Sequence, residues 1–253
     1  MRIAILLACA VALFAAACGG KSKATRPPEP AVVESSLGRG AQQVWMFRPA
    51  RGRPRSLVLF FHGYGGKIET TPALHRPWLL HLAQRGSLVL YPRYEVVPGA
   101  PNSLQHALLG LRNAAHALRP GPLPVVAIGY SRGGGLAVDY AAIARGIAPV
   151  PRAVLAVFPA YLDPSLNFRG IDPRTRFLFL VGDRDVDQRD VAARYLAGLL
   201  TRSGHREVAI GLVHSSKTFS ATHLSVLEDS AGARLRYWQP ADRLIASVRE
   251  KSP

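Results

Sequence analysis

The stretch LPVVAIGYSRGGG, residues 123–135, decides the fold predicted for this chain. Its first half is apolar and rich in β-branched residues, which is typical of a buried strand, while residues 136–144 have helical composition. Between them the Gly-x-Ser-x-Gly pattern of residues 129–133 places a serine on a strained turn. A side chain at Gly129 or Gly133 would collide with the adjoining strand or helix. We therefore predict a strand, a tight turn and a helix that together present Ser131 at the end of the strand.

The rest of the chain alternates between apolar runs, which predict buried strands, and amphipathic stretches, which predict helices that cover them. The predicted strands occupy residues 42–47, 56–61, 87–91, 123–128, 153–158, 176–181 and 208–213. The predicted helices lie near residues 78–83, 104–118, 136–144 and 191–200, and a last one from Pro240 directs Leu244, Ile245 and Val248 inward. This alternation predicts the α/β class: a three-layer sandwich with a mostly parallel central sheet and helices on both faces. The polar segment 163–174 is too short for a large cap domain and is expected to be a loop at the pocket rim.

Ser131 is a candidate nucleophile, because the helix after it points its positive N-terminal dipole toward the negative charge that develops in acyl transfer. A glycine-flanked serine can also be an ordinary turn residue, so this interpretation needs an acid and a base elsewhere. Asp185 is the first candidate for the acid, since it closely follows a predicted strand at the carboxyl edge of the sheet. Asp183 and Asp187 are the alternatives, and each of the three could instead form a turn or cap a helix.

The candidate base is a histidine that follows Asp185, if the three groups occur in the chain order serine, aspartate, histidine. Only His205, His214 and His223 meet this condition. His205 precedes the last predicted strand and is expected at the opposite edge of the sheet, whereas His214 ends that strand and His223 lies in the loop beyond it. A loop gives the imidazole freedom to reach both partners, so His223 is the first candidate and His214 the alternative.

A second glycine cluster, HGYGG at residues 62–66, directly follows the predicted strand 56–61. Exposed backbone amides in such a loop can donate hydrogen bonds to an oxyanion. A plain glycine-rich turn is the alternative. The remaining early histidines, including His62 and His75, are interpreted as surface, packing or loop residues.

The N-terminal 36 residues are expected to lie outside the folded domain. Residues 1–17 carry an early positive charge, an apolar run and small residues at the end, as a secretory signal peptide does. Cys18 follows alanines that resemble the lipobox of bacterial lipoproteins, although the usual leucine three places earlier is absent; a signal peptide cleaved without lipidation is the alternative. Residues 18–36 are polar and proline-rich, which predicts a disordered tether. Residues 37–253 are assigned to a single folded domain.

The cysteine content and the charge exclude several classes of function. Cys9 and Cys18 are the only cysteines, so the domain is expected to contain no disulfide and no Cys/His cluster for a metal. Thirty-two Lys and Arg against sixteen Asp and Glu give a formal net charge of +16, nearly all from arginine. The sequence has neither a block of basic residues nor the interleaving of basic and aromatic residues that indicates nucleic-acid binding. We therefore expect no nucleic-acid partner. In an exported protein this charge favours anionic envelope surfaces or acidic substrates, and a solvated arginine-rich surface is the alternative.

Four motifs together resemble the α/β-hydrolase family, in its esterase and dienelactone-hydrolase-like branch: residues 62–66, 129–133, 182–185 and 222–223. The resemblance covers residue 41 to the end of the chain. It implies Ser131 as nucleophile, His223 as base and Asp185 as acid. It also implies that the backbone amides of Arg132 and Tyr64 form the oxyanion hole, with Gly65 as an alternative to Tyr64.

The function expected from this resemblance is hydrolysis of a small carboxylic ester through an acyl-enzyme, without a cofactor or a metal. A peptidase, thioesterase or perhydrolase could use the same three side chains, and a catalytically silent envelope-binding protein on a hydrolase scaffold is the alternative of a different class. The protein is expected to be a monomer and to be exported. It is either anchored in the bacterial cell envelope through lipidated Cys18, or periplasmic or secreted without that lipid.

Overall fold

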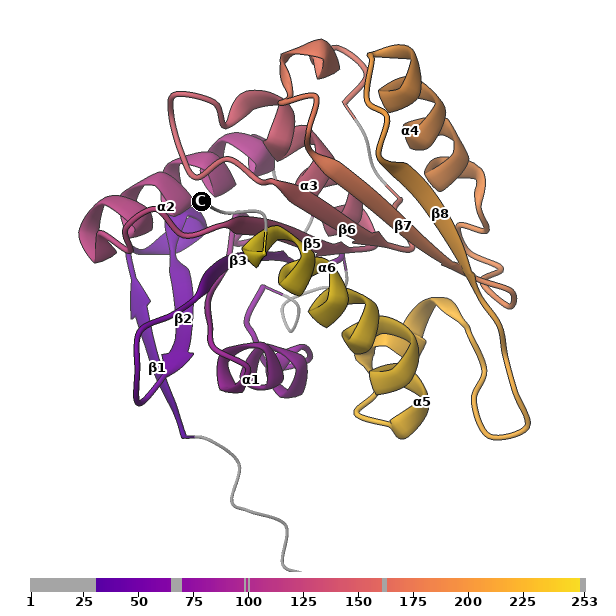
Figure 1. Cartoon of the computed structure of the whole chain (residues 1–253), viewed down its shortest axis with the longest axis horizontal. Helices are drawn as coiled ribbons and strands as arrows, with labels where there is room; N and C mark the ends of the chain where they lie inside the picture. Colours follow the sequence, from indigo (N-terminus) through magenta and orange to yellow (C-terminus); the bar gives the residue numbers. More distant parts are fainter. Residues whose placement is uncertain (1–30, 65–69, 98, 100, 161–162, 251–253) are drawn as a thin grey trace, which may run out of the picture.

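Figure 1 shows the computed structural model, which describes residues 31–64, 70–97, 99, 101–160 and 163–250. Its strands are β1 (Val32–Leu37), β2 (Val44–Pro49), β3 (Ser56–Phe61), β4 (Ser87–Pro92), β5 (Val125–Tyr130), β6 (Ala153–Val157), β7 (Arg176–Gly182) and β8 (Val208–Val213). The main helices are α1 (Arg76–Gln84), α2 (Ser103–Leu118), α3 (Arg132–Ile143), α4 (Val191–Arg202) and α6 (Gln239–Arg249). Short helical segments are η1 (Gly40–Gln42), η2 (Phe168–Gly170), η3 (His223–Leu227), α5 (Ala231–Ala233) and the π-helical η4 (Arg234–Trp238).

The strands form one sheet in the order β1-β2-β4-β3-β5-β6-β7-β8. From β4 to β8 neighbouring strands are parallel, whereas β1 pairs antiparallel with β2 and β2 pairs antiparallel with β4. Every residue of β3, β4, β5 and β6 is buried, as their continuous apolar composition predicts for strands covered on both faces. The chain leaves β3 for β4 on one side and then returns for β5 on the other. In open α/β sheets ligands bind at such a change of direction, which lies here at the carboxyl ends of β3 and β5.

Helices cover both faces of the sheet, so the predicted three-layer architecture is confirmed (Figure 1). On one face α2, α3 and α4 contribute Leu108, Ala137 and Leu196 to one buried apolar cluster. On the other face α1 and α6 contribute Trp78 and Ile245 to a second cluster. The last helix turns its apolar side inward as expected, with Val248 buried and Leu244 partly buried. In the part of the chain that the structure describes, no helix is both long enough and apolar enough to cross a bilayer.

The structure corrects the expected boundary of the disordered tether. Residues 32–36 were expected to be disordered, but they belong to β1, whose backbone pairs with β2 from Val32 opposite Pro49 to Leu37 opposite Val44. The ladder gives these backbone groups partners although Glu34, Ser35 and Ser36 are exposed and polar, as is typical of an edge strand. The domain therefore begins by residue 32. Residues 1–30, which include the predicted signal peptide, Cys18 and most of the predicted tether, lie outside the described residues.

Candidate active site

Ser131 lies on a sharp turn between β5 and α3, as the sequence pattern predicts. Its backbone has φ 53° and ψ −125°, a left-handed conformation that costs energy for a residue with a side chain. Two hydrogen bonds hold this conformation: the Ser131 amide donates to the carbonyl of Val157 at 2.9 Å, and the Ala160 amide donates to the carbonyl of Ser131 at 3.1 Å. The turn therefore fixes Ser131 against the end of β6, with 8% of the residue exposed.

The glycines on either side of Ser131 are required by close backbone contacts. A Cβ atom at Gly129 would overlap the carbonyl of Gly133, the second residue of α3. A Cβ atom at Gly133 would overlap the carbonyls of Phe61 and His62 at the end of β3. Because each overlap involves backbone, no side-chain rotation can relieve it. The prediction that both positions need glycine is confirmed, and the contact brings the end of β3 to the start of α3.

His223 lies between Ser131 and Asp185. Its Nε2 is 3.0 Å from the Ser131 hydroxyl oxygen, and its Nδ1 is 3.3 Å from Oδ2 of Asp185. In the tautomer that satisfies both contacts, Nδ1–H donates to the carboxylate and Nε2 accepts from the serine hydroxyl. The side chains of His223 and Asp185 are 12% and 0% exposed. The geometry is that of a nucleophile, a base and a group that orients the base.

The imidazole of His223 is held by aromatic neighbours as well as by its hydrogen bonds. The ring centroids of Tyr130 and Phe158 lie 5.3 Å and 5.4 Å from that of His223. His223 is the first residue of η3, so the position interpreted from sequence as a loop is a short 3-10 helix after β8. The helical turn, together with the two rings, restricts the imidazole to the direction that faces Ser131.

Asp185 is buried at the carboxyl end of β7 and accepts two backbone hydrogen bonds. The amides of Asp187 and Gln188 donate to Oδ1 at 3.0 Å and 3.1 Å. These donors fix the plane of the carboxylate, which leaves Oδ2 directed at His223. The structure thus brings the first candidate for the acid next to the first candidate for the base.

The alternative acid and base are paired with each other instead. Asp183 accepts hydrogen bonds from the Ser215 amide at 2.9 Å and the Ser215 hydroxyl at 2.5 Å, and these bonds lower the pKa of Asp183. His214 is 73% exposed, with Nδ1 3.7 Å from Asp183. Asp187 is exposed, and its backbone amide donates a hydrogen bond to Asp185. His205 is buried against Phe168 and Phe177, away from the other candidates, as expected for the opposite edge of the sheet.

The glycine-rich loop after β3 begins at His62, which is a buried packing residue. Its ring stacks on Tyr94 with centroids 4.0 Å apart, and its nitrogens lie 2.7 Å and 2.9 Å from the carbonyls of Gly63 and Arg93. Burial lowers the pKa of His62 to about 4, so the ring is neutral at pH 7. His62 therefore fixes the start of the loop that carries Tyr64, whose side chain is 59% exposed. Gly65 lies outside the described residues.

A buried ion pair beside the nucleophile was not predicted from the sequence. The guanidinium of Arg132 contacts the carboxylate of Glu95 and donates to the Ser103 hydroxyl at 3.1 Å. Arg132 is 16% exposed at the side chain and Glu95 is 1% exposed. The pair ties α3 to the segment after β4 and packs the guanidinium 6.0 Å from the Tyr64 ring centroid. The only signal in the sequence is the place of Arg132 directly after Ser131, which does not identify a partner 37 residues away.

The described residues contain one group with metal-ligand chemistry, formed by Asp185, Asp187 and His223 with ligand atoms within 4.8 Å of one another. Both ring nitrogens of His223 already face Asp185 and Ser131. A metal here would have to displace one of these contacts. The arrangement fits proton transfer better than metal binding.

Comparison with known proteins supports the fold but gives no match by sequence. No protein-family model and no curated protein sequence matches this chain. Among solved structures, an α/β-hydrolase enzyme from a Medee basin deep-sea metagenome library is similar, with a TM-score of 0.63, 18% identity, and coverage of 88% of this chain and 99% of the other. A thermostable esterase from Pseudomonas putida has a TM-score of 0.63 and 18% identity over 87% of this chain and 84% of its own.

A third similar structure is from Klebsiella pneumoniae and is provisionally named a dienelactone hydrolase. It has a TM-score of 0.62 and 16% identity, and the match covers 85% of this chain and 99% of the other. At such low identity these likenesses concern the arrangement of the backbone. Together with the strand order and the turn at Ser131, they show that this chain has the α/β-hydrolase fold.

Proposed function

We propose that this protein is an exported serine hydrolase that cleaves small carboxylic esters through an acyl-enzyme. The observation that carries the proposal is the position of His223, within hydrogen-bond distance of both Ser131 and Asp185. These three side chains come from separate segments and meet at the carboxyl edge of the sheet. A serine hydroxyl becomes a nucleophile when a base accepts its proton and a carboxylate orients that base.

In the proposed first step, Ser131 Oγ attacks the ester carbonyl while His223 Nε2 takes the hydroxyl proton. Asp185 stabilises the imidazolium through Nδ1–H and remains ionised, supported by the amides of Asp187 and Gln188. His223 then gives the proton to the leaving alcohol, which departs as the carbonyl re-forms. In the second step His223 takes a proton from water, whose oxygen attacks the acyl-enzyme, and the carboxylic acid leaves as Ser131 regains its proton.

The oxyanion formed in each step is proposed to accept hydrogen bonds from the backbone amides of Arg132 and Tyr64, with Gly65 as the alternative to Tyr64. Arg132 is the first residue of α3, so its amide lies at the positive end of the helix dipole. The contact of Gly133 with the carbonyls of Phe61 and His62 brings the Tyr64 loop beside this helix end. Each donor of this kind is worth on the order of 3 kcal/mol of transition-state stabilisation.

Ester substrates are favoured because similar structures are named as esterases, which supports the esterase and dienelactone-hydrolase-like branch. Export rests on the composition of residues 1–17, and membrane attachment rests on the place of Cys18. A substrate panel of p-nitrophenyl esters, thioesters and peptide p-nitroanilides separates an esterase from a thioesterase or a peptidase.

The test is hydrolysis of p-nitrophenyl butyrate by the wild-type protein and by Ser131→Ala. We expect kcat to fall by on the order of 10⁵-fold, because the chain loses its nucleophile. Ser203→Ala is the matched control and should keep wild-type activity. Ser203 lies in the turn between α4 and β8, at the opposite edge of the sheet from the three side chains. Equal turnover by the wild-type protein and Ser131→Ala would remove Ser131 from this role.

A further inference from the structure

The amino edge of the sheet carries an excess of positive charge that the proposed chemistry does not use. Five arginines gather there, in the turn before β3, the turn before β4 and the end of α6; we call this set the basic face: Arg51, Arg53, Arg55, Arg85 and Arg249. Two adjoining cavities of about 610 Å³ and 300 Å³ share Arg55 and Gln84 in their linings, so the five side chains border one continuous hollow surface.

A single carboxylate, that of Asp242, lines these two cavities. It is shared between Arg85, whose Nε lies at 3.1 Å, and His81, whose Nε2 lies at 2.9 Å. Arg249 donates to the hydroxyls of Ser56 and Ser87 at 2.7 Å and 3.3 Å, which are neutral partners. Burial and the nearby charges of Arg55 and Arg85 lower the pKa of Arg249, so the guanidinium groups repel one another at this edge.

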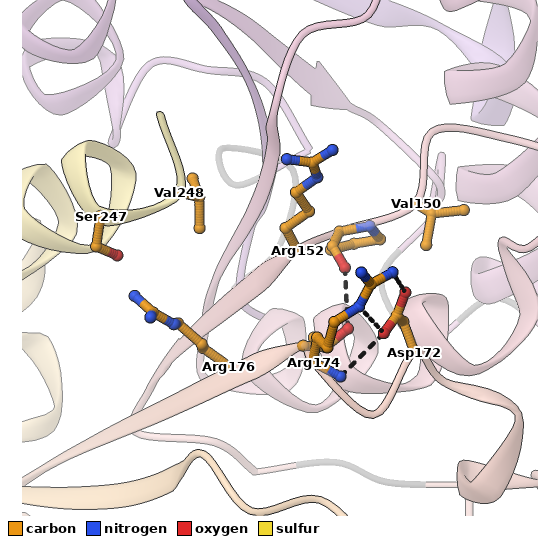
Figure 2. A pocket seen from close by; sticks show the side chains of 9 residues that line it. Val150, Arg152, Asp172, Arg174, Arg176, Ser247 and Val248 are labelled. Atoms are coloured by element: carbon orange, nitrogen blue, oxygen red, sulfur yellow. Dashed lines mark hydrogen bonds and ion pairs between the residues drawn. The ribbon is translucent and has the colours of Figure 1, made fainter. Parts of the chain in front are cut away.

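Two arginines elsewhere on the same edge, Arg174 and Arg176, are paired with carboxylates. Figure 2 shows the neighbouring cavity of about 520 Å³, in which Arg174 forms a forked contact with Asp172. Arg176 lines the same cavity and forms an ion pair with Glu207 at 2.6 Å. In the described part of the chain, Arg51 and Arg53 form no ion pair of this kind, and both are exposed. The unbalanced charge is therefore concentrated around the turn before β3.

The N-terminal segment enters the domain at this same place. Ala31 lines the larger cavity beside Arg51 and Arg53, and its carbonyl accepts a hydrogen bond from the Ala50 amide at 2.9 Å. The 30 residues that precede Ala31 include the apolar segment and Cys18. A chain tethered to a bilayer through this segment would hold the basic face next to the lipid headgroups, where arginine binds phosphate oxygens.

We infer that the basic face docks on the phosphate groups of an anionic phospholipid bilayer. Ser56 and Ser87 mark the amino ends of β3 and β4, whereas Ser131 follows the carboxyl end of β5, which is parallel to β3. Six residues of strand separate the two edges by about 20 Å. A docked protein therefore turns Ser131 away from the membrane. Given the proposed hydrolase function, the substrate comes from the aqueous phase and not from the bilayer.

The test compares binding of the full chain to vesicles of phosphatidylcholine alone and of phosphatidylcholine with about one third phosphatidylglycerol, by co-sedimentation. Any apolar group at the N-terminus, either the apolar segment before cleavage or a lipid on Cys18, contributes equally to both, so the difference between vesicles measures the electrostatic contact. Each arginine near an anionic surface strengthens binding by about fivefold. The variant R51Q/R53Q/R55Q should lose about 100-fold of the phosphatidylglycerol-dependent affinity, and wild-type binding should fall steeply with added salt.

The control is R112Q/R184Q/R189Q, which removes the same charge from exposed positions outside the basic face. The phosphatidylglycerol-dependent affinity of this control should stay within about threefold of that of the wild type. If the triple variant of the basic face unfolds, R51Q/R53Q replaces it, since neither residue is buried and the double variant should fold. Its phosphatidylglycerol-dependent affinity should fall by about 25-fold. Equal losses in the test and control variants would overturn the inference. So would full displacement by inorganic phosphate but not by chloride at equal ionic strength, which would indicate a site for a free anion.

The orientation of the docked protein, with Ser131 turned away from the bilayer, is tested by a separate measurement of ester turnover. Vesicle-bound protein should hydrolyse soluble p-nitrophenyl butyrate at the rate of free protein, because Ser131 faces the solvent. A strong loss of turnover on binding would contradict the orientation. A protein with no ester turnover in either state would contradict the proposed function and leave the vesicle-binding result to stand by itself.

Discussion

The carboxyl and amino edges of the same sheet differ in how they hold their polar groups. At the carboxyl edge Asp185, Glu95 and His62 are almost completely buried, and each polar group has a specific partner. At the amino edge Arg51 and Arg53 are exposed on a turn. Burying a charge requires a matched partner, whereas an exposed charge needs only water. The carboxyl edge is therefore sensitive to the position of each atom, and the amino edge is sensitive chiefly to the total charge.

This difference suggests two kinds of function on one fold. Acyl transfer needs a hydroxyl, an imidazole and a carboxylate within tenths of an ångström of their working positions. Attraction to an anionic surface works over about the Debye length and tolerates mobile side chains. The predictions that follow test whether the carboxyl edge is as sensitive as this comparison claims.

After Ser131→Ala, the largest effect is expected from Asp185→Asn. The amide cannot hold the His223 imidazolium as a carboxylate does, so kcat for p-nitrophenyl butyrate should fall on the order of 10⁴-fold. Asp183→Asn is the matched control two residues away, where the carboxylate contacts Ser215 and His214 instead. It should retain activity within about threefold. A comparable loss in both variants would show that the whole turn, and not Asp185, supports the chemistry.

The next effect concerns the turn itself. Gly133→Ala places a methyl group onto the carbonyls of Phe61 and His62, so we expect a loss of more than about 4 kcal/mol in the free energy of unfolding by urea. Gly170→Ala is the control, because its nearest neighbour is 3.8 Å away, an ordinary contact distance. It should change stability by less than about 1 kcal/mol. A Gly133→Ala protein as stable as the wild type would mean that β3 and α3 can move apart without a loss in the free energy of unfolding.

A smaller effect at neutral pH is expected from His75→Phe. His75 packs against Phe60 with centroids 5.0 Å apart, and in the described residues neither ring nitrogen has a hydrogen-bond partner. Removing these nitrogens should raise the free energy of unfolding by about 1 kcal/mol at pH 7. Arg53→Gln, on the exposed amino edge, should change it by less than about 0.5 kcal/mol.

The advantage of His75→Phe should grow as the pH falls. Burial lowers the pKa of His75 from 6.5 to about 3. Between these values the unfolded chain binds a proton that the folded chain does not, so acid destabilises the wild-type fold. The difference in unfolding free energy between variant and wild type should therefore increase below pH 6.5, by about 1.4 kcal/mol per pH unit at most. A difference that is constant from pH 7 to pH 4 would contradict this account.

The local features of the fold could be predicted from the sequence. The strands and the turn at Ser131 follow from apolar runs and from glycines that backbone contact requires. The edge strand β1 could not be predicted, because its exposed polar residues follow a proline-rich segment and the strand is stabilised by pairing with β2. The segment from η3 to η4 has no periodic pattern that distinguishes it from a loop.

The candidate site was predictable only as a set of alternatives. Asp183, Asp185 and Asp187 share one turn, and sequence spacing does not show that Asp183 contacts Ser215 whereas Asp185 contacts His223. The pair of Arg132 with Glu95 and the gathering of arginines at the amino edge are non-local. Both depend on how the whole sheet brings distant turns together.

The measurement that tests the central claim most directly is the intact mass of the protein after reaction with a fluorophosphonate probe, followed by peptide mapping. Our account predicts one adduct on Ser131 in the wild-type protein, much slower labelling of His223→Ala, and none of Ser131→Ala. An unmodified wild-type protein, or an adduct on a different residue, would contradict the claim that the carboxyl edge activates Ser131.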